Sequence, residues 1–405
     1  MSDLNSAEKP MTILCLASYF KGTTFLTAAK AAGCRVVLVT RDKLHNEPWP
    51  WDSIDDVFYM PQLSKQPDMI YAIAYFMRGK SVDQIIPLDD YDVLTVAALR
   101  EHFRLPNMGE SVMRHFRDKL AMRVKARQEG FRVPEFTAVF NYDQLREFMG
   151  RVPPPWLLKP RAEAGAMGIK RMDHAEMLWR KLDELGDLQS YFLLEQYVAG
   201  PVYHVDAIVW QGKVVFAMAH QYLQPPIDVA HDGGVFVTRT MPRQDKETKA
   251  LLKLHNRLIL ALGMVRGVAH TEFIKGPDGE FYFLETAARV GGANIEQLVE
   301  ASSGINLWAE WARLETAALR GQEYQVPEDK GAYAGVMICL ARQEWPDLSG
   351  YQEPEIVYRV HKQQHAGLIV ASPQHERVEQ LIQDYSQRFA YDFLAVAPPL
   401  DTAPT

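Results

Sequence analysis

Apolar runs and helical spacing alternate along the first hundred or so residues. An apolar run at 13–17 has the length of a buried strand, and the apolar positions within 25–32 recur at helical spacing. Further apolar runs follow at 35–40 and 84–88. A strand, a helix and a strand within about thirty residues are typical of a right-handed parallel unit. The pattern therefore predicts a doubly wound, Rossmann-like first lobe over residues 1–112.

The rest of the chain has a different pattern. After a stiff, proline-rich linker at 151–155, short strand-like segments follow one another with turns between them, which is typical of antiparallel sheet. These segments lie at 156–159, 169–172, 191–195, 203–209 and 213–219. Helical patterns follow at 245–262 and 294–319, before a mixed final part and a Pro-rich tail that we expect to be disordered. The fold class that we predict is α/β, with α+β lobes after the first.

The composition indicates an ordinary globular protein that acts on small molecules. A chain of 405 residues, 47% of them hydrophobic, is too long for a single core, so several lobes are expected. The net charge of −7 argues against a nucleic-acid or membrane partner, because both favour an excess of Lys and Arg. Cys15, Cys34 and Cys339 form no metal-binding pair, and the first apolar run is too short for a signal segment. We expect a reduced, cytoplasmic location.

A hairpin in the second half of the chain carries two glutamates. Apolar strands flank an Asp-Gly pair at 278–279, and if these residues form the centre of the turn, Glu272 lies opposite Glu285. Carboxylates about 4.5 to 5.5 Å apart on one face are destabilising unless a cation lies between them. The pair therefore predicts a divalent-cation site, for which magnesium is usual in phosphoryl transfer. The alternatives are two exposed glutamates, or a three-residue loop that places the carboxylates on opposite faces.

The same strand alternation places other polar groups beside these glutamates. His270 lies on the same face, and so does Arg289 if the chain stays extended. Arg289 could neutralise a developing oxyanion or bind a substrate carboxylate, and Gly291 and Gly292 would allow close backbone approach. A salt bridge from Arg289 to one of the glutamates is the alternative.

Earlier segments could bind phosphates and a base. Lys159 ends an apolar strand, and the loop of small residues at 163–168 could bind phosphates through its backbone N–H groups. The strand at 191–198 could offer backbone groups to an adenine, although core packing also explains its apolar pattern. The first turn, 17–23, lacks the glycine spacing of a dinucleotide site. Two aspartates at 89–90 follow the carboxyl end of a strand and could face a ligand, although a solvated helix start is the commoner role.

In this order, the motifs resemble the ATP-grasp superfamily over about residues 118–310. The matching segments are Asp118-Lys119, Leu158-Lys159-Pro160, Leu194 to Val198, Gly200 to Asp206, His270-Thr-Glu272 and Leu284 to Arg289. The resemblance implies an N-terminal pre-ATP-grasp domain at 1–112 and two ATP-grasp lobes. The lobes are a lid at 113–198 and a large lobe with the metal site at 199–322. A C-terminal α+β subdomain and tail would then occupy 323–405.

The resemblance also implies roles for individual residues. ATP would lie between two antiparallel sheets, Glu272 and Glu285 would bind one or two Mg²⁺ ions, with Mn²⁺ as a possible substitute, and Arg289 would be catalytic. The residues implied in ATP binding are Lys119, Lys159, Gly165, Ala166, Met167, Gly168, Glu195, Gln196, Tyr197, Val198 and Asp206. Near the substrate we expect His270, Gly291, Gly292 and His231, the last in a loop that could close over the site. A solvated loop position is the alternative for His231.

The segments around Glu272 and Arg289 are similar to the branch that contains L-amino-acid ligases. This branch implies ATP-dependent carboxylate–amine ligation through an acylphosphate, with a small carboxylate and an amine as substrates and ADP and phosphate as products. The alternatives are a biotin-carboxylase-like or carbamoyl-phosphate-type enzyme, and a non-catalytic ATP-binding regulator. Dimerisation, common in such ligases, stays open.

Three positions depart from the commoner pattern of the superfamily. Ala287 stands where many members have a metal-binding Asn, so the number of ions is open. Val202 stands in the place of a ribose-binding Glu, which leaves Asp206 or His204 as weaker candidates. Ala166 replaces a Ser or Gly in the phosphate loop.

Overall fold

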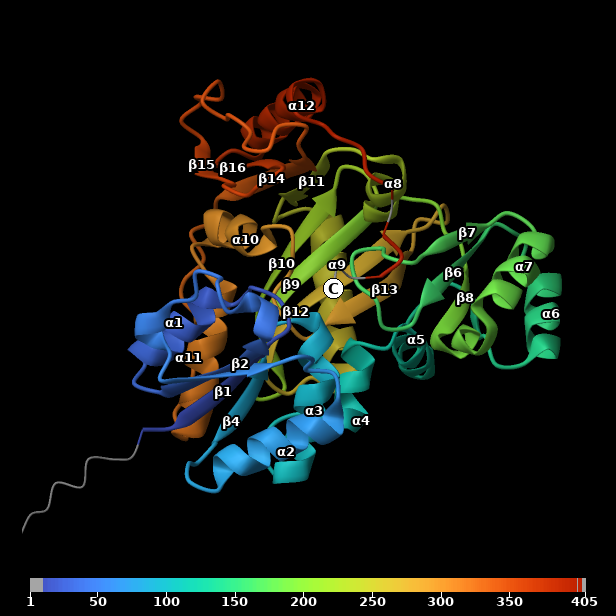
Figure 1. Ribbon diagram of the computed structural model, residues 1–405. Helices are drawn as coiled ribbons and strands as arrows, with labels where there is room; N and C mark the ends of the chain where they lie inside the picture. The colour runs from blue at the N-terminus through green and yellow to red at the C-terminus, as the bar shows by residue number, and fades with distance from the viewer. Residues whose placement is uncertain (1–9, 399, 403–405) are drawn as a thin grey trace, which may run out of the picture.

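The computed structural model describes residues 10–398 and 400–402, and its N-terminal lobe is built on a parallel sheet with the strand order β3-β2-β1-β4 (Figure 1). The strands are β1 (Thr12–Ala17), β2 (Arg35–Arg41), β3 (Asp56–Met60) and β4 (Gln84–Pro87). The helices are α1 (Thr23–Ala31), α2 (Gln66–Met77) and α3 (Val93–Phe103). Three of these strands were predicted from apolar runs. The less buried β3 was not.

Strand β1 is buried on both faces, which explains its continuous apolar run. Ile13 and Cys15 pack with α1 and with α11 (Leu307–Leu319), whereas Leu14 and Leu16 pack with α2 and α3. Helix α11 comes from far along the chain and lies beside α1 (Figure 1). The prediction of a doubly wound first lobe is therefore confirmed.

The lid projects from the rest of the molecule on an antiparallel sheet with the order β5-β8-β6-β7 (Figure 1). Its strands are β5 (Phe136–Ala138), β6 (Trp156–Pro160), β7 (Lys170–Met172) and β8 (Phe192–Gln196). Helices α6 (Tyr142–Arg151) and α7 (Ala175–Leu185) cover one face with their apolar sides. Helices α4 (Glu110–Met113) and α5 (Lys119–Gln128) connect this sheet to the first lobe.

The large sheet has eight strands among the described residues, in the order β13-β12-β9-β10-β11-β14-β16-β15. The strands of its first part are β9 (Val202–Trp210), β10 (Lys213–Tyr222), β11 (Phe236–Thr240), β12 (Gly267–Lys275) and β13 (Phe281–Ala287). Helices α8 (Pro226–Asp232), α9 (Lys246–Ala261) and α10 (Ile295–Ser303) belong to the same lobe. Neighbouring strands are antiparallel, as the sequence pattern predicts for this part of the chain.

The C-terminal strands continue this sheet. They are β14 (Tyr333–Leu340), β15 (Ile356–Arg359) and β16 (His365–Ser372), and β14 pairs with β11 of the large lobe. Helix α12 (His375–Asp392) covers one face of these strands and α10 covers the other. The unit predicted at 323–405 thus shares a sheet with the large lobe, and the boundaries of the four domains stay predictions.

The tail after α12 returns to the lid, although the sequence predicted disorder there. The Ala395 N–H donates to the Leu340 carbonyl at 2.9 Å, and Leu400 accepts from the Gly168 N–H at 3.0 Å. Asp401 lies 2.6 Å from the ammonium group of Lys170 on β7. The described part of the tail therefore links the end of the large sheet to the lid.

None of the helices that the structure describes is both long and apolar enough to cross a membrane.

Candidate functional site

Glu272 on β12 lies directly opposite Glu285 on β13, as predicted, but the turn between the strands differs from the predicted one. The Gly276 N–H donates to the Glu280 carbonyl at 2.9 Å, so the loop between these residues has three members, 277–279. A three-residue loop shifts the pairing by one position, and by itself it would place the two glutamates on opposite faces.

A β-bulge corrects this shift. Phe273 pairs with Phe283, but the next pair is Glu272 with Glu285, so Leu284 is the extra residue on β13. Phe273 and Phe283 belong to the core behind the sheet, whereas Glu272, Leu284 and Glu285 all line a cavity on the other face. The bulge thus restores the arrangement that the sequence predicted from a different turn.

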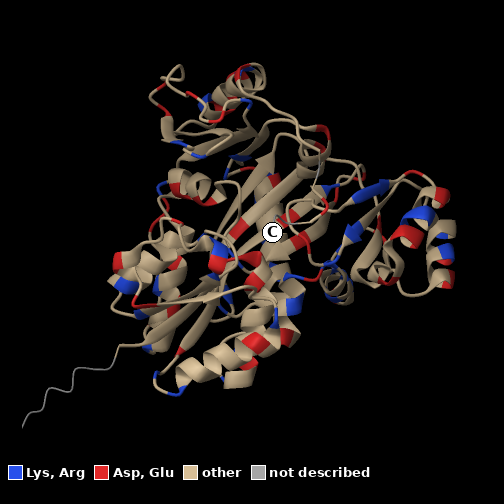
Figure 2. Cartoon of the chain, viewed as in Figure 1, with Lys and Arg blue, Asp and Glu red and all other residues tan. Residues whose placement is uncertain are grey.

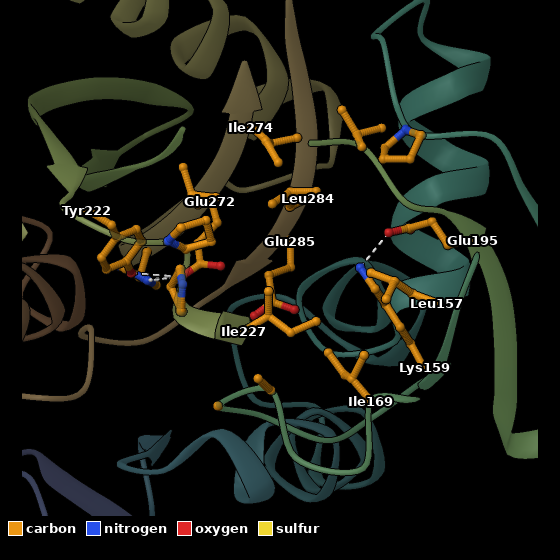
Figure 3. A pocket seen from close by; sticks show the side chains of 18 of the residues that line it. Leu157, Lys159, Ile169, Glu195, Tyr222, Ile227, Glu272, Ile274, Leu284 and Glu285 are labelled. Carbon is orange, nitrogen blue, oxygen red and sulfur yellow. Dashed lines mark hydrogen bonds and ion pairs between the residues drawn. The ribbon is translucent and has the colours of Figure 1, made fainter. Parts of the chain in front are cut away.

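The cavity has a volume of about 290 Å³ and lies between the lid sheet and the large sheet. Figure 2 shows basic positions along β7 of the lid and acidic positions on the facing strands of the large sheet. The lid contributes Leu157, Lys159 and Ile169, while the large lobe contributes Ile274 and Leu284 among others (Figure 3). The cavity therefore has an apolar part suited to a flat ring and a charged end at the two glutamates.

Each of the two glutamates has its own cationic or hydrogen-bonding neighbour. The Lys119 ammonium lies 2.9 Å from Oε2 of Glu285. Tyr222 donates its hydroxyl to Oε1 of Glu272 at 2.8 Å, and Nε2 of His270 lies 3.5 Å from the same oxygen. Burial alone would lower the pKa of His270, but Asp206 and Glu272 outweigh it and raise the pKa to about 9. These neighbours hold the two carboxylates in place at the wall of the cavity.

Arg289 also lines the cavity, but it forms an ion pair with neither glutamate. Its guanidinium lies 3.1 Å from the carboxylate of Asp90, which follows β4 of the N-terminal lobe. Burial alone would raise the pKa of Asp90, but Arg289 and Arg117 outweigh it and lower the pKa to about 2. Asp89 does cap a short helical turn at 90–92, but both aspartates are buried, so the prediction of a solvated position is wrong. The pair links the N-terminal lobe to the strand that carries Glu285.

Lys159 points to Glu195 rather than into an open space (Figure 3). Glu195 also accepts from Nε of Arg123 at 2.6 Å, and its side chain is only 1% exposed. Burial alone would raise the pKa of Glu195, but Arg123 and Lys159 outweigh it and lower the pKa. The side chain of Glu195 is therefore a structural anion that orients Lys159 at the wall of the cavity.

The segment after β8 lines the cavity, as expected for an adenine site. The Gln196 N–H donates to the Glu135 carbonyl at 2.7 Å, and the Tyr197 N–H donates to the Pro155 carbonyl at 3.2 Å. No backbone acceptor for the Val198 N–H is found within the described residues. Val198 is therefore the position in this segment whose N–H can bind a ligand.

The small-residue loop of the lid lies at the edge of the cavity. Gly165 and Ala166 line it with positive φ values of 64° and 62°, which favour glycine and strain the alanine. Met167 and Gly168 do not line it, and the Gly168 N–H is bonded to the tail. Lys119 donates to the Glu163 carbonyl at 2.6 Å and so ties the base of the loop to α5.

Three further predicted site residues lie away from the cavity. Asp206 is fully buried, with its two oxygens accepting from His204 and His270, so it cannot bind a ribose in the cavity and that assignment is wrong. His231 lines a separate hollow on the lid side with the basic residues of β7 and α7. Gly291 does not line the cavity and lies next to Ile295 and His270, whereas Gly292 lines it.

Sequence reasoning missed Tyr222 and Arg123 as parts of the site, and it gave a ligand-facing role for Asp90 only as the less favoured alternative. Asp90 follows β4 at the carboxyl edge of the parallel sheet, where ligands commonly bind, and this position was a usable signal. Arg123 lies one helical turn after Lys119, which places both on one side of α5. The position of Tyr222 depends on the β10 register, which the sequence did not show.

No family model matches this chain. Over 321 residues the chain is 25% identical to an L-arginine-specific L-amino acid ligase of Bacillus subtilis, and this match covers 75% of the chain and 76% of that relative. A D-alanine–D-alanine ligase of Neisseria gonorrhoeae is 23% identical over 193 residues, which cover 46% of the chain and 62% of the relative.

Two solved structures resemble the whole described architecture. The crystal structure of an L-amino acid ligase from Bacillus licheniformis has a TM-score of 0.75 at 18% identity and covers 96% of this chain and 99% of its own. A carboxyaminoimidazole ribonucleotide synthase from Aspergillus clavatus in complex with ATP has a TM-score of 0.71 at 14% identity, covering 94% and 99%. Both likenesses extend across all three sheets.

Proposed function

Because the chain has the ATP-grasp fold of these ligases, we propose that it is an ATP-dependent carboxylate–amine ligase that joins amino acids, or an amino acid and another small acid or amine. The observation that carries the proposal is the pair Glu272 and Glu285, which lie opposite each other on neighbouring strands and line a cavity that Arg289 also lines. The sequence relationship to an L-amino acid ligase over three quarters of both chains supports the amino-acid substrate class.

The two glutamates fit a magnesium ion. Both offer carboxylate oxygens, the hard donors that this ion prefers, and one oxygen of Glu272 is already held by Tyr222 while the other has no hydrogen-bond partner among the described residues. When bound, magnesium would neutralise charge on the phosphates of the nucleotide. Ala287 adds no further ligand, which favours a single ion bound by the glutamates with water and phosphate completing the coordination.

ATP would lie with its adenine against the apolar part of the cavity and its phosphates at the glutamates. The Val198 N–H would bind the adenine edge, and the Gly165 and Ala166 segment would lie over the phosphates. Lys119 would stand beside the γ-phosphate because it lies 2.9 Å from Glu285. These contacts would hold the phosphate that is transferred next to Arg289.

Two displacements would then complete the reaction, the first at the γ-phosphorus of ATP and the second at the acyl carbon. An oxygen of the substrate carboxylate attacks the γ-phosphorus and the bond to the β-phosphate oxygen breaks, which gives an acylphosphate and ADP. The amine nitrogen attacks the acyl carbon, phosphate leaves with its bonding electron pair, and the nitrogen loses a proton. Arg289 would hold the substrate carboxylate for the first displacement and would bind the charge that develops on the acyl oxygen in the second.

The test is release of phosphate from ATP and Mg²⁺ with a panel of L-amino acids, supplied singly and in pairs, followed by mass spectrometry of the products. We expect release that requires a particular pair, with a product lighter than the two substrates together by one water. If no pair raises release above background, amino-acid ligation is wrong. Release that depends on added bicarbonate would instead support a carboxylating enzyme. Replacing Mg²⁺ by Mn²⁺ in the active mixture tests the exchange of metals.

A further inference from the structure

We propose that Asp206 is a positioning residue that acts through His270 to orient Glu272, so that one oxygen of this glutamate is fixed and the other is presented to the metal. The inference rests on the proposed function, because it assigns a purpose to a buried cluster directly behind the proposed metal ligand. The cluster, which we call the Asp206 cluster, comprises His204, Asp206, His220, Tyr222, Thr238 and His270.

Adjacent strands bring this cluster together. Across β9 and β12, Asp206 pairs with His270 and His204 pairs with Glu272, and β10 places His220 opposite His204. His204, Asp206 and His220 are fully buried, and His270 is 8% exposed at the edge of the cavity. A buried carboxylate at this place is costly unless it is paired, so its presence calls for an explanation.

The polar contacts of the cluster connect Asp206 to Glu272 through the ring of His270. Asp206 accepts from Nδ1 of His204 at 2.7 Å through one oxygen and from Nδ1 of His270 at 2.9 Å through the other. A carboxylate can only accept, so both Nδ1 atoms carry protons. The ring of His270 is therefore fixed in orientation, with its Nε2 3.5 Å from Oε1 of Glu272.

Tyr222 completes the support of Glu272. Its hydroxyl donates to the same oxygen, Oε1, at 2.8 Å, and the Tyr222 ring packs against that of His204 at a centroid distance of 4.8 Å. Within the described residues, no hydrogen bond to Oε2 of Glu272 is found. One oxygen of Glu272 is thus held by the cluster, and the second is left for a ligand on the side of Glu285.

These distances distinguish a hydrogen-bonded cluster from a second metal site. Three side chains of the cluster lie close enough together to be considered as ligands of one metal ion: His204, Asp206 and His270. However, ligands bound to one zinc at about 2.0 Å in a tetrahedron are separated by roughly 3.3 Å, because the ion lies between them. The separations of 2.7 and 2.9 Å in the cluster are those of direct N–H to oxygen hydrogen bonds. Support of a metal ligand by an outer carboxylate and histidine is a recurrent arrangement.

The test measures metal binding apart from turnover. Asp206→Asn keeps the size of the side chain but removes its charge and one acceptor. Binding of Mn²⁺ to this variant and to the wild type, in the presence of saturating ADP, can be followed by electron paramagnetic resonance. We expect the dissociation constant for Mn²⁺ to rise by about 10 to 100-fold, the usual loss when an outer partner of a metal ligand is removed. Binding of ADP without metal should stay as in the wild type.

Two further variants separate orientation from folding. Thr238→Val removes the partner of His204 Nε2 within the same cluster but leaves His270 and Glu272 in place, so it should lower stability without changing the Mn²⁺ constant. Tyr222→Phe removes only the hydroxyl on Glu272 and should weaken Mn²⁺ binding even if Asp206→Asn fails to fold.

The outcomes are distinct. Wild-type Mn²⁺ affinity in Tyr222→Phe and in folded Asp206→Asn overturns the positioning role, and so does an equal loss in Thr238→Val. If the wild type itself binds no Mn²⁺ with ADP, the proposed function fails as well. If the wild type does bind Mn²⁺ with ADP and the variants bind it equally well, the positioning role fails but the proposed function stands.

Discussion

Glu272 lies directly opposite Glu285 even though β12 and β13 change register between this pair and the turn. The pairing depends on the extra residue Leu284, which compensates for a three-residue loop. Because the bulge also turns Leu284 into the cavity, one backbone irregularity supplies both an apolar wall and the facing carboxylates. The site geometry is therefore set by a strand feature next to the metal ligands rather than by the turn.

Loss of one glutamate should remove turnover without unfolding the chain. Glu285→Ala should lower ATP turnover by about 100-fold or more, because even an outer partner of a metal ligand is typically worth about 10 to 100-fold. The variant also leaves Lys119 without its 2.9 Å partner, which should weaken its hold on the nucleotide. The measurement is ADP formation in the active substrate mixture. Glu280→Ala, at the exposed tip of the same hairpin, is the matched control and should stay active. Full activity in Glu285→Ala would contradict the metal assignment.

Arg123 should matter mainly for stability. It is 1% exposed and holds the buried carboxylate of Glu195, so Arg123→Met leaves an anion that only Lys159 still pairs. Breaking a buried pair in this way typically costs about 3 to 5 kcal/mol. Urea unfolding should show this loss. Arg127→Met, on the exposed side of the same helix, breaks a pair at 3.4 Å that is worth about 1 kcal/mol or less. Similar losses in both variants would argue against the buried network.

Arg289 should act on the chemical step more than on nucleotide binding. Its guanidinium bonds both Asp90 and the Val290 carbonyl, and the single ammonium of Arg289→Lys cannot reproduce this fork. We expect kcat to fall by about 100-fold, the usual effect of losing one donor to a developing oxyanion. The KM for ATP should change little. Arg313→Lys, at an exposed helical position, is the control. A rise in the KM for ATP with kcat unchanged would show that Arg289 binds nucleotide instead.

The sequence predicted the parts of the fold that follow simple periodicity. The buried runs at β1, β2 and β4 are apolar on both faces, so their strands and the parallel lobe could be recognised from single segments. The pairing of Glu272 with Glu285 was also predicted, but from a turn that the structure does not contain. The bulge that corrects it has no strong local signal, because Leu284 fits a regular strand as well as an irregular one.

The contacts between distant segments could not be predicted in this way. Asp90 and Arg289 are 199 positions apart, and their ion pair depends on how the first lobe docks on the large one. Asp206 has the residue type of a ligand-binding acid, but its burial follows from the register of three strands. The tail contact with Gly168 likewise depends on where α12 ends in space. Each of these is decided by tertiary packing, which a local pattern does not contain.

Asp92 should make stability depend on pH near neutrality. Its side chain is buried against Ser18, and burial together with the neighbouring charge of Asp89 raises its pKa to about 7. A carboxyl group with a raised pKa stabilises the fold fully below its unfolded pKa near 4, and this contribution is lost as the pH rises through about 7. The free energy of unfolding of Asp92→Asn, measured relative to that of the wild type, should therefore increase by about 1 to 4 kcal/mol from pH 5 to pH 8. Urea unfolding at both pH values measures this change. Exposed Asp42→Asn should show none, and a constant difference for Asp92→Asn would contradict the raised pKa.

Removing the end of the tail should loosen the lid by a small, measurable amount. Ending the chain after Ala395 removes the Leu400 carbonyl from the Gly168 N–H and Asp401 from Lys170, but keeps the Ala395 bond to β14. The neutral hydrogen bond is worth about 1 kcal/mol, which corresponds to roughly a fivefold change in the opening of the lid loop. The ion pair adds little, because Asp401 is 72% exposed.

Hydrogen exchange at the Gly168 amide measures this opening directly. The truncated chain should exchange that amide about five times faster, with amides in β1 unchanged, because β1 lies in a separate core. Asp401→Asn is the matched variant, since it removes the ion pair and keeps the backbone bond, and its exchange should stay close to that of the wild type. If Asp401→Asn reproduces the full effect of truncation, the charge rather than the Leu400 carbonyl holds the tail on the lid. If neither variant changes exchange at Gly168, the tail does not restrain the lid in solution.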